Sequence, residues 1–409
     1  MSIATVAASA TMGSPLLGLA LLVACATLVA LGLRRLRVPA SPLVGGTLAG
    51  VMLGSAFLGR IAPDTYLNLY EGPPEMLHQS IASERAIGAL AFAAGASQAK
   101  VDPNDLERLG AERDQDRAAW ESARGEHRGP FVAAALALAG IVMATAFTRG
   151  ARPVRPGGPD VAIALWSFAI PAVCVAVLAR WRGDDVLAPS TALVAAACGC
   201  GAWWVSGAEC ATGRGGARDA ARRAATSASL ATALACALAA AAFVRGLEPT
   251  RATIPALALC GGAALSSLVR GRVLRWWRAI GRRLAAVAVP SLAAIVAIGI
   301  DPLRDLSPMV FVLLFLVAED GRWLGAFAAR VLGGEPAGVS VRSAMVGLSA
   351  GPTMLAFVGA GAATRVLSPA SAAGLLLAAA LLEFLRPARL RLARRLEDAQ
   401  AETEDAERR

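Results

Sequence analysis

The chain has 409 residues, of which 56% are hydrophobic, 17% charged and 5% aromatic, and its mean hydropathy is +0.56. Soluble domains carry about a quarter charged residues, so these values exclude a disordered chain, a disulfide scaffold, a coiled coil and an ordinary cytosolic enzyme. The net charge of +10 is carried almost entirely by arginine. That charge could serve nucleic-acid binding. In so apolar a chain we instead expect basic loops at the anionic inner face of a membrane, and no nucleic-acid partner.

The first apolar run covers residues 15–33 and ends at Arg34 and Arg35. No basic residue precedes it, whereas a cleavable signal peptide carries its charge first. The run is long enough to span a bilayer. Positive charge after it favours an N-terminus on the outer side.

Similar apolar runs follow through most of the chain. Because an isolated strand would leave backbone groups unpaired in lipid, each must be helical. We therefore predict an all-α polytopic membrane bundle of about 12–13 transmembrane helices in residues 1–386. Its location would be a bacterial inner membrane, crossed many times. The expected segments are 15–33, 42–59, 81–98, 130–148, 159–180, 187–206, 222–244, 250–269, 284–300, 308–330, 340–361 and 369–386.

Three polar stretches interrupt this pattern. We expect residues 99–129 to form a polar loop and residues 387–409 a charged C-terminal tail. Residues 270–283 place their apolar side chains on one helical face, which predicts a basic interfacial helix; a plain basic loop is the alternative. With this helix count, the early and late basic clusters fall on opposite sides of the membrane. Either the count is off by one between them or the bias is weak, and the denser late clusters favour a cytoplasmic C-terminus.

Two apolar segments contain an internal proline, at Ile170-Pro171 and at Gly351-Pro352-Thr353. Proline removes a helical hydrogen bond and clashes with the preceding turn. One break in each half of the chain is the pattern of transporters with inverted repeats, whose half-helix ends face an ion site. Two ordinary kinked helices are the alternative.

Cofactor and metal chemistry is not expected. The chain has seven cysteines and two histidines, and none of them has metal-ligand spacing. No paired catalytic carboxylates, HExxH motif or nucleophile elbow occurs, so we do not expect an enzyme.

Residues 34–63, RRLRVPASPLVGGTLAGVMLGSAFLGRIAP, resemble the opening of the monovalent cation/proton antiporter superfamily. In that family a basic turn and a proline lead into a short glycine-rich helix. Gly46, Gly50 and Gly54 lie four residues apart, so they share one face and allow close helix packing. Weaker similarities cover most of residues 15–386. The resemblance implies the antiporter fold, a homodimer in the lipid bilayer, and exchange of protons for a monovalent cation, Na⁺ or K⁺.

The family's working helix usually carries an aspartate that exchanges a proton for a cation. By helix order that segment is 187–206, which has no carboxylate. If the order is shifted by one, the segment is 222–244, which has none in its apolar interior either. Ionisable residues within membrane segments are functional candidates, and the chain offers Glu319, Asp320 and Arg322. Glu319 and Arg322 are three residues apart and could pair. We expect Asp320 to be the first candidate for ion coupling, Glu319 the second, and Arg322 a competing internal cation. Alternatively, the three charges only stabilise packing at a water-filled rim.

Two functions remain open from the sequence. One is a secondary transporter that exchanges protons for Na⁺ or K⁺. The other is a transport-inactive protein of the same fold, acting as a membrane sensor or interaction subunit. The missing aspartate favours the second, whereas the helix breaks and the charged cluster favour the first.

Overall fold

The computed structural model describes residues 14–97, 103–146, 156–201, 216–268, 271–336, 340, 341, 344 and 351–407, and every regular element in these ranges is helical. Within them, seven helices are long and apolar enough to cross a membrane. The chain is therefore an integral, multi-pass helical membrane protein, as predicted. The larger helix count and the inverted repeats stay predictions. The seven candidate spans are Pro15–Arg35, Ser41–Ile61, Glu107–Thr145, Gly158–Arg182, Ala225–Gly246, Ala279–Ile298 and Pro369–Arg389.

The helix α2 (Pro15–Arg35) begins at a side-chain cap. The hydroxyl oxygen of Ser14 accepts a hydrogen bond from the Leu17 amide at 3.2 Å, which satisfies one of the free donors of a helix start. The next helix, α3 (Ser41–Leu53), approaches α2 closely, since a β-carbon added to Gly45 would lie 2.6 Å from the Cα of Ala30.

The glycine face of α3 packs directly on α12 (Gly271–Ile298). A β-carbon added to Gly46 would lie only 2.1 Å from the carbonyl oxygen of Pro290. Because both partners advance by four residues per contact, the two helices run parallel in close backbone contact. The contacts join Gly46 to Pro290, Gly50 to Ala294 and Gly54 to Ile298.

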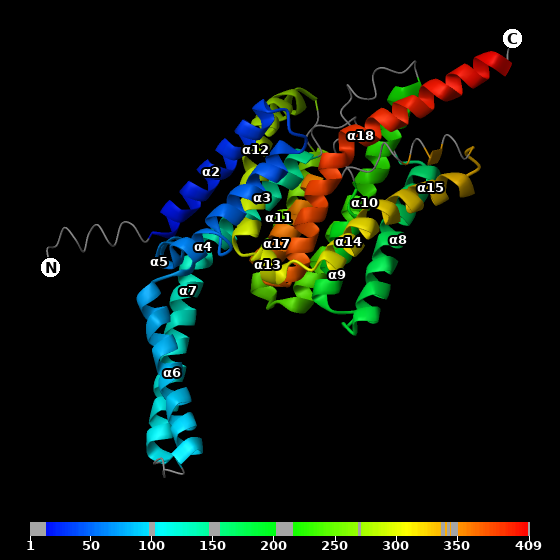
Figure 1. The fold of residues 1–409 in the computed structure, drawn as a ribbon. Helices are drawn as coiled ribbons and strands as arrows, with labels where there is room; N and C mark the ends of the chain where they lie inside the picture. Colours follow the sequence, from blue (N-terminus) through cyan, green and yellow to red (C-terminus); the bar gives the residue numbers. More distant parts are fainter. Residues whose placement is uncertain are drawn as a thin grey trace.

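A long helical hairpin projects from the bundle beyond the start of α2 (Figure 1). It consists of α6 (Pro74–Ser97) and the 44-residue α7 (Pro103–Ala146). At 1.5 Å per residue α7 is about 66 Å long. Its apolar second half lies in the bundle, while its charged first half pairs with α6 (Figure 1).

The hairpin corrects two predictions. The expected span 81–98 lies in α6, which is not among the candidate spans, and the expected polar loop 99–129 is helical from Pro103 onward. Glu84 and Arg85 interrupt the apolar character of α6. These charges keep α6 below the apolar length that a membrane span needs.

A buried carboxylate joins the hairpin to the bundle. Three short helices precede α6: α4 (Leu58–Ile61), α5 (Pro63–Tyr66) and the π-helix η1 (Leu67–Glu71). The Glu71 carboxylate accepts hydrogen bonds from Arg124 at 2.5 Å, from Arg128, and from the Tyr66 hydroxyl at 3.2 Å. Burial alone would raise the pKa of Glu71, but the Arg128 and Arg124 guanidinium groups outweigh it and hold that pKa below its usual value.

The predicted break at Ile170-Pro171 is wrong, because α8 (Gly158–Arg182) is continuous through it. Transmembrane helices tolerate proline where neighbouring segments pack around it. Pro171 is buried, and a β-carbon on Gly321 of the adjacent π-helix η2 (Val317–Gly321) would lie 3.3 Å from its ring.

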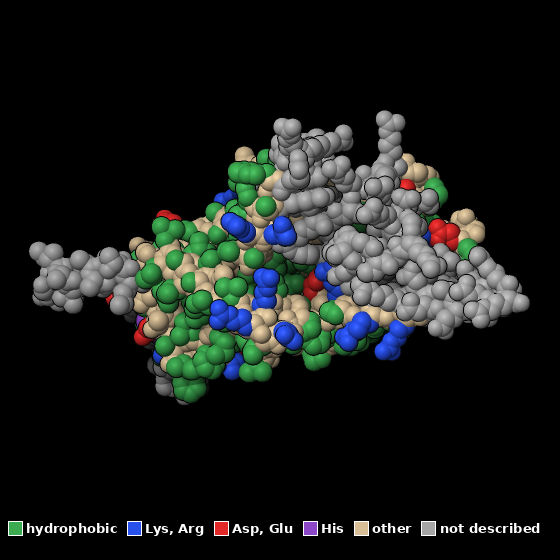
Figure 2. All heavy atoms as spheres, turned by 90° about the horizontal axis from the view of Figure 1, so that it is seen from above, with side chains coloured by type: hydrophobic (Ala, Val, Ile, Leu, Met, Phe, Trp, Pro, Cys, Tyr) green, Lys and Arg blue, Asp and Glu red, His purple; other side chains and the backbone are tan. Residues whose placement is uncertain are grey.

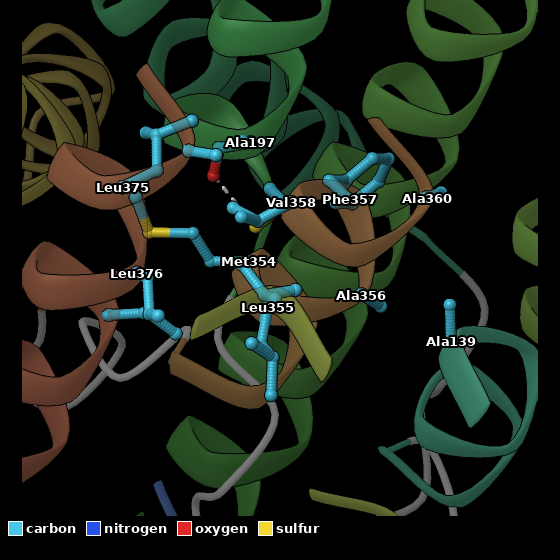
Figure 3. Close-up of a cluster of buried hydrophobic side chains, with 14 of the residues drawn as sticks. Ala139, Ala197, Met354, Leu355, Ala356, Phe357, Val358, Ala360, Leu375 and Leu376 are labelled. Carbon is cyan, nitrogen blue, oxygen red and sulfur yellow. Dashed lines mark hydrogen bonds between the residues drawn. The ribbon is translucent and has the colours of Figure 1, made fainter. Parts of the chain in front are cut away.

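Two short apolar helices lie in the interior, α9 (Pro189–Gly199) and α17 (Gly351–Ala363). Residues 351–361 of α17 are all buried. Their side chains meet Ala139 of α7, Ala197 of α9, and Leu375 and Leu376 of α18 (Pro369–Glu407) (Figure 3). Two further long helices, α10 (Gly216–Gly246) and α11 (Pro249–Leu268), complete the core.

Two other predicted boundaries fall inside continuous helices. Residues 271–283, expected as a separate interfacial helix, form the first half of α12. Residues 387–407, expected as a separate tail, continue α18 through Pro387. The remaining elements, which lead from α12 to α17, include α13 (Pro302–Asp305), α14 (Pro308–Leu316), η2 and α15 (Arg322–Leu332).

The arginine-rich segments gather at one end of the bundle. Three of these segments lie at the same end (Figure 1): the end of α2, the start of α12 and the upper half of α18. The opposite end carries the Arg60–Asp301 ion pair at 2.9 Å. Viewed from the arginine-rich end, several basic side chains lie beside a hollow in which an acidic side chain is visible (Figure 2). Leaving residues 81–98 out of the expected crossings puts the basic residues after residue 33, those of 270–283 and those of the C-terminal tail on one side.

Candidate functional site

The two short helices α9 and α17 pack side by side in opposite directions. A β-carbon on Gly361, near the end of α17, would lie 2.4 Å from the side chain of Leu193, near the start of α9. At Cys200 the backbone leaves the helix and becomes extended. The carbonyl end of α9 is therefore buried inside the protein, where it carries a partial negative charge.

Arg322 occupies this buried carbonyl end. Its Nη1 donates to the Cys200 carbonyl oxygen at 3.0 Å, and its Nε donates to the Ala318 carbonyl oxygen. The residue is 4% exposed, and its Nη2 has no partner among the described residues. The Arg322 guanidinium thus places a fixed positive charge on the carbonyl groups at the end of α9. Without Arg322, a bound cation could occupy this position.

The chain after α9 is held by a second polar contact. The Gly201 amide donates to the Thr232 hydroxyl oxygen of α10 at 3.1 Å. The Cys200 thiol donates to the Ala197 carbonyl oxygen at 3.0 Å. Both contacts are buried, so the segment that Arg322 binds has a defined position.

Glu319 forms an ion pair with a residue that the sequence did not suggest. Its Oε1 lies 2.8 Å from the Nε of Arg389, and both side chains are 14% exposed. The expected pairing of Glu319 with Arg322 is replaced because Glu319 lies within η2. The wider i→i+5 turn of a π-helix changes the angular relation between the two positions.

The Glu319–Arg389 pair is only partly satisfied. Glu319 Oε2 and Arg389 Nη2 are both buried, and neither has a partner in the part of the chain that the structure describes. Buried polar atoms are normally paired with protein or ordered water. The two open positions could therefore take water, a proton or a cation.

Asp320 lies apart from this pair. Its side chain is exposed, whereas Glu319 beside it is half-buried. The first candidate for ion coupling thus faces away from the interior, and the second candidate faces into it.

The predicted second break lies at the start of α17. Gly351, Pro352 and Thr353 form its first turn, and the residues immediately before Gly351 lie outside the described ranges. A β-carbon on Gly351 would lie 2.3 Å from the Cγ of Glu383, so Glu383 packs on this helix start. The Thr353 hydroxyl is buried and has no partner among the described residues. A carboxylate at a helix N-terminus is electrostatically favourable.

Glu383 and Arg389 both lie on α18. The sequence favoured an interfacial position for Glu383 near a helix end and did not single out Arg389. The available signal was the three-residue spacing of Glu383, Arg386 and Arg389, which keeps charges on neighbouring faces of one helix. Arg386 and Glu383 form an ion pair at 3.6 Å. Ending the span at residue 386 assigned Arg389 to the tail and hid its partnership with Glu319.

Comparisons with known proteins do not identify the chain. No family model matches the sequence, and no curated protein matches it significantly. Among the described residues, no group of three or more His, Cys, Asp or Glu side chains could hold a metal ion. Inferences about function must come from the geometry around α9, α17 and Glu319.

Proposed function

We propose that this membrane protein is a secondary transporter that exchanges protons for a monovalent cation, Na⁺ or K⁺. The observation that carries the proposal is the Glu319 carboxylate. It is largely buried, held by a single contact to Arg389, and keeps one oxygen unpartnered among the described residues. A carboxylate in this setting can hold a proton or, after losing it, a cation.

The neighbouring groups support this role. Arg322 is bound to backbone carbonyl oxygens, so its charge stabilises the end of α9 and does not saturate Glu319. Half-helix ends next to an ionisable side chain are the usual surroundings of a transporter's ion site. In the proposed exchange, Glu319 releases its proton and its carboxylate then takes the cation, so the site carries the same net charge with either occupant.

We place the arginine-rich end on the cytoplasmic side. Positively charged segments near membrane helices are retained there, and the ends of α2 and α18 and the start of α12 all contribute arginines. Because about 20 residues of α18 rise about 30 Å, the Glu319–Arg389 pair lies toward this end. The hollow in Figure 2 is a route by which ions could enter from that side. A bacterial inner membrane and a homodimer, implied by the family resemblance, belong to the same proposal.

A transport-inactive sensor or interaction subunit is the second candidate. It is favoured by Arg322, which fills the carbonyl end of α9 with a fixed cation, and by the absence of any carboxylate in α9. Such a protein would keep the fold without the exchange chemistry.

Proton flux in proteoliposomes distinguishes the two candidates. Vesicles loaded with a pH dye would receive pulses of Na⁺, K⁺ or Li⁺ across a pH series. We expect a saturable, cation-specific signal that is lost in Glu319→Gln and retained in the matched exposed variant Asp320→Asn. No signal from folded, inserted protein would refute the transporter and support the inactive candidate. Loss in Asp320→Asn alone would return the coupling role to Asp320.

A further inference from the structure

We infer that Arg389, on the C-terminal helix α18, is the positioning residue that holds Glu319 in the absence of a bound cation. The inference rests on the proposed function and assigns the counter-charge of the carboxylate to a different helix from the one the sequence suggested. Arg389 and the transported cation would then compete for the same carboxylate.

The geometry of the contact suits an exchangeable partner. Nε of Arg389 meets one oxygen of Glu319 at 2.8 Å, while Arg389 Nη2 and Glu319 Oε2 stay unpartnered among the described residues. A two-bond, fork-like pair would be stronger and more rigid. A cation replaces this contact at a lower cost than a two-bond pair, because only one donor of the guanidinium loses its acceptor.

The other nearby charges are committed elsewhere. Besides Arg389, the ionisable groups that act on Glu319 are Arg322 and Asp320. Arg322 is bound to the Ala318 and Cys200 carbonyl oxygens, and Arg386 is paired with Glu383. The helices α8 and α9 also pack on this segment. They bring the thiols of Cys198 and Cys200 near Arg322, and Cys174 lies near Cys198.

The position of Arg389 is fixed by packing. Gly374 of α18 packs on α14, and a β-carbon there would lie 3.1 Å from Leu314. The start of α17 lies against Glu383, which is six residues, or about 1.7 turns, before Arg389 on the same helix. The helix α18 is continuous across Pro387. Its contacts with α14 and α17 therefore also position the guanidinium of Arg389 next to Glu319.

Removing the guanidinium should change both the cation affinity and the pH response of exchange. A neighbouring opposite charge typically shifts the protonation of a carboxylate by about 1–3 pH units. In Arg389→Gln we therefore expect the pH of half-maximal exchange to rise by about 1 unit or more. At alkaline pH, where protons no longer compete, we expect KM for the cation to fall about tenfold, because its competitor is gone.

The test compares Arg389→Gln with Arg389→Lys and with the exposed neighbour Arg391→Gln in the dye-loaded proteoliposomes. Arg389→Lys keeps the charge and should stay close to wild type in KM and pH profile, and Arg391→Gln should match wild type. Wild-type kinetics in folded Arg389→Gln would overturn the inference while leaving the exchange function standing. Absence of exchange in the wild type would refute the proposed function itself.

A folding failure of Arg389→Gln is also informative. If the variant fails because it leaves the Glu319 charge buried alone, the double variant Glu319→Gln/Arg389→Gln should recover a folded, monodisperse protein. Recovery would support the pairing, and continued misfolding of the double variant, with Glu319→Gln alone folded, would contradict it.

Discussion

Substitution of Gly46 by alanine tests the packing of α3 on α12. In Gly46→Ala the new β-carbon would lie 2.1 Å from the Pro290 carbonyl oxygen, whereas real β-carbons essentially never come within 3.0 Å of another atom. The obstacle is backbone, so no side chain can rotate away. The two helices must separate by roughly 1 Å, which forfeits about a quarter to a half of each van der Waals contact across the interface.

The expected loss follows from the number of contacts involved. About 40 atom pairs at about 0.15 kcal/mol each, losing a third of their energy, amount to about 2 kcal/mol. This value lies within the range of about 1–3 kcal/mol that overpacking usually costs. Gly32 offers the matched control, because a β-carbon there meets nothing within 4 Å. In Gly32→Ala the helix should gain about 0.5–1 kcal/mol, since alanine loses less backbone entropy than glycine.

The assay is thermal unfolding of the purified proteins in one detergent, followed by helical circular dichroism and by the monodisperse fraction after heating. We expect Gly46→Ala to melt below wild type and Gly32→Ala to melt at or above it. Equal melting temperatures for Gly46→Ala and wild type would refute the close approach of the two helices.

Three further predictions concern the hairpin, the end of α9 and the orientation of the chain. Glu71→Gln should lower the free energy of opening the base of the hairpin by about 2–3 kcal/mol. This loss is smaller than that of a fully buried ion pair because Arg124 is partly exposed. Hydrogen exchange should accelerate at that base but not in the bundle. Since the pKa of folded Glu71 lies below its usual value of 4.5, its contribution is present above about pH 4.5 and is lost as the pH falls further. The protection factors at that base, corrected for the intrinsic pH dependence of amide exchange, should stay constant from pH 8 to about 5 and fall in stronger acid. Arg322→Gln should destabilise the protein by about 2–3 kcal/mol, and Arg322→Lys should not restore it, because an ammonium lacks the planar fork that reaches two carbonyl oxygens; full thermal stability in either variant would contradict this role. In a cysteine-free variant, single cysteines at Leu303→Cys and Leu36→Cys report the orientation. A thiol reagent that cannot cross membranes should label Leu303→Cys from outside intact cells and leave Leu36→Cys unlabelled. The reverse pattern would contradict the proposed orientation.

The sequence predicted the membrane class and the helix contact at Gly46, Gly50 and Gly54, because composition and a four-residue repeat are local signals. It failed at α6, whose apolar residues resemble a membrane segment although the helix lies outside the bundle and is not among the candidate spans. It also failed at Pro171, because a proline breaks a helix only where its surroundings do not pack around it. Gly321 provides such packing, and no local pattern could have revealed it.

The candidate site was predicted in part. Glu319 and Arg322 are visible in the sequence as rare charges within an apolar segment. Their partners are not visible, because Arg389 is 70 positions further along the chain and the Cys200 carbonyl oxygen is a backbone atom far before them. The π-turn at η2 decides which of the two charges meets which partner. It depends on packing against α8 and α9 and has no distinct sequence signal.

The projecting hairpin of α6 and α7 has a practical consequence for imaging. Most small membrane proteins are hidden within their detergent belt, so single particles offer few features by which they can be oriented. Here the charged first half of α7, which is roughly 66 Å long in all, stands outside the bundle (Figure 1), and the Glu71 contacts fix it to the membrane part. The protein thus carries its own orientation marker for electron cryomicroscopy, and a fusion at the hairpin tip would enlarge that marker without touching the bundle.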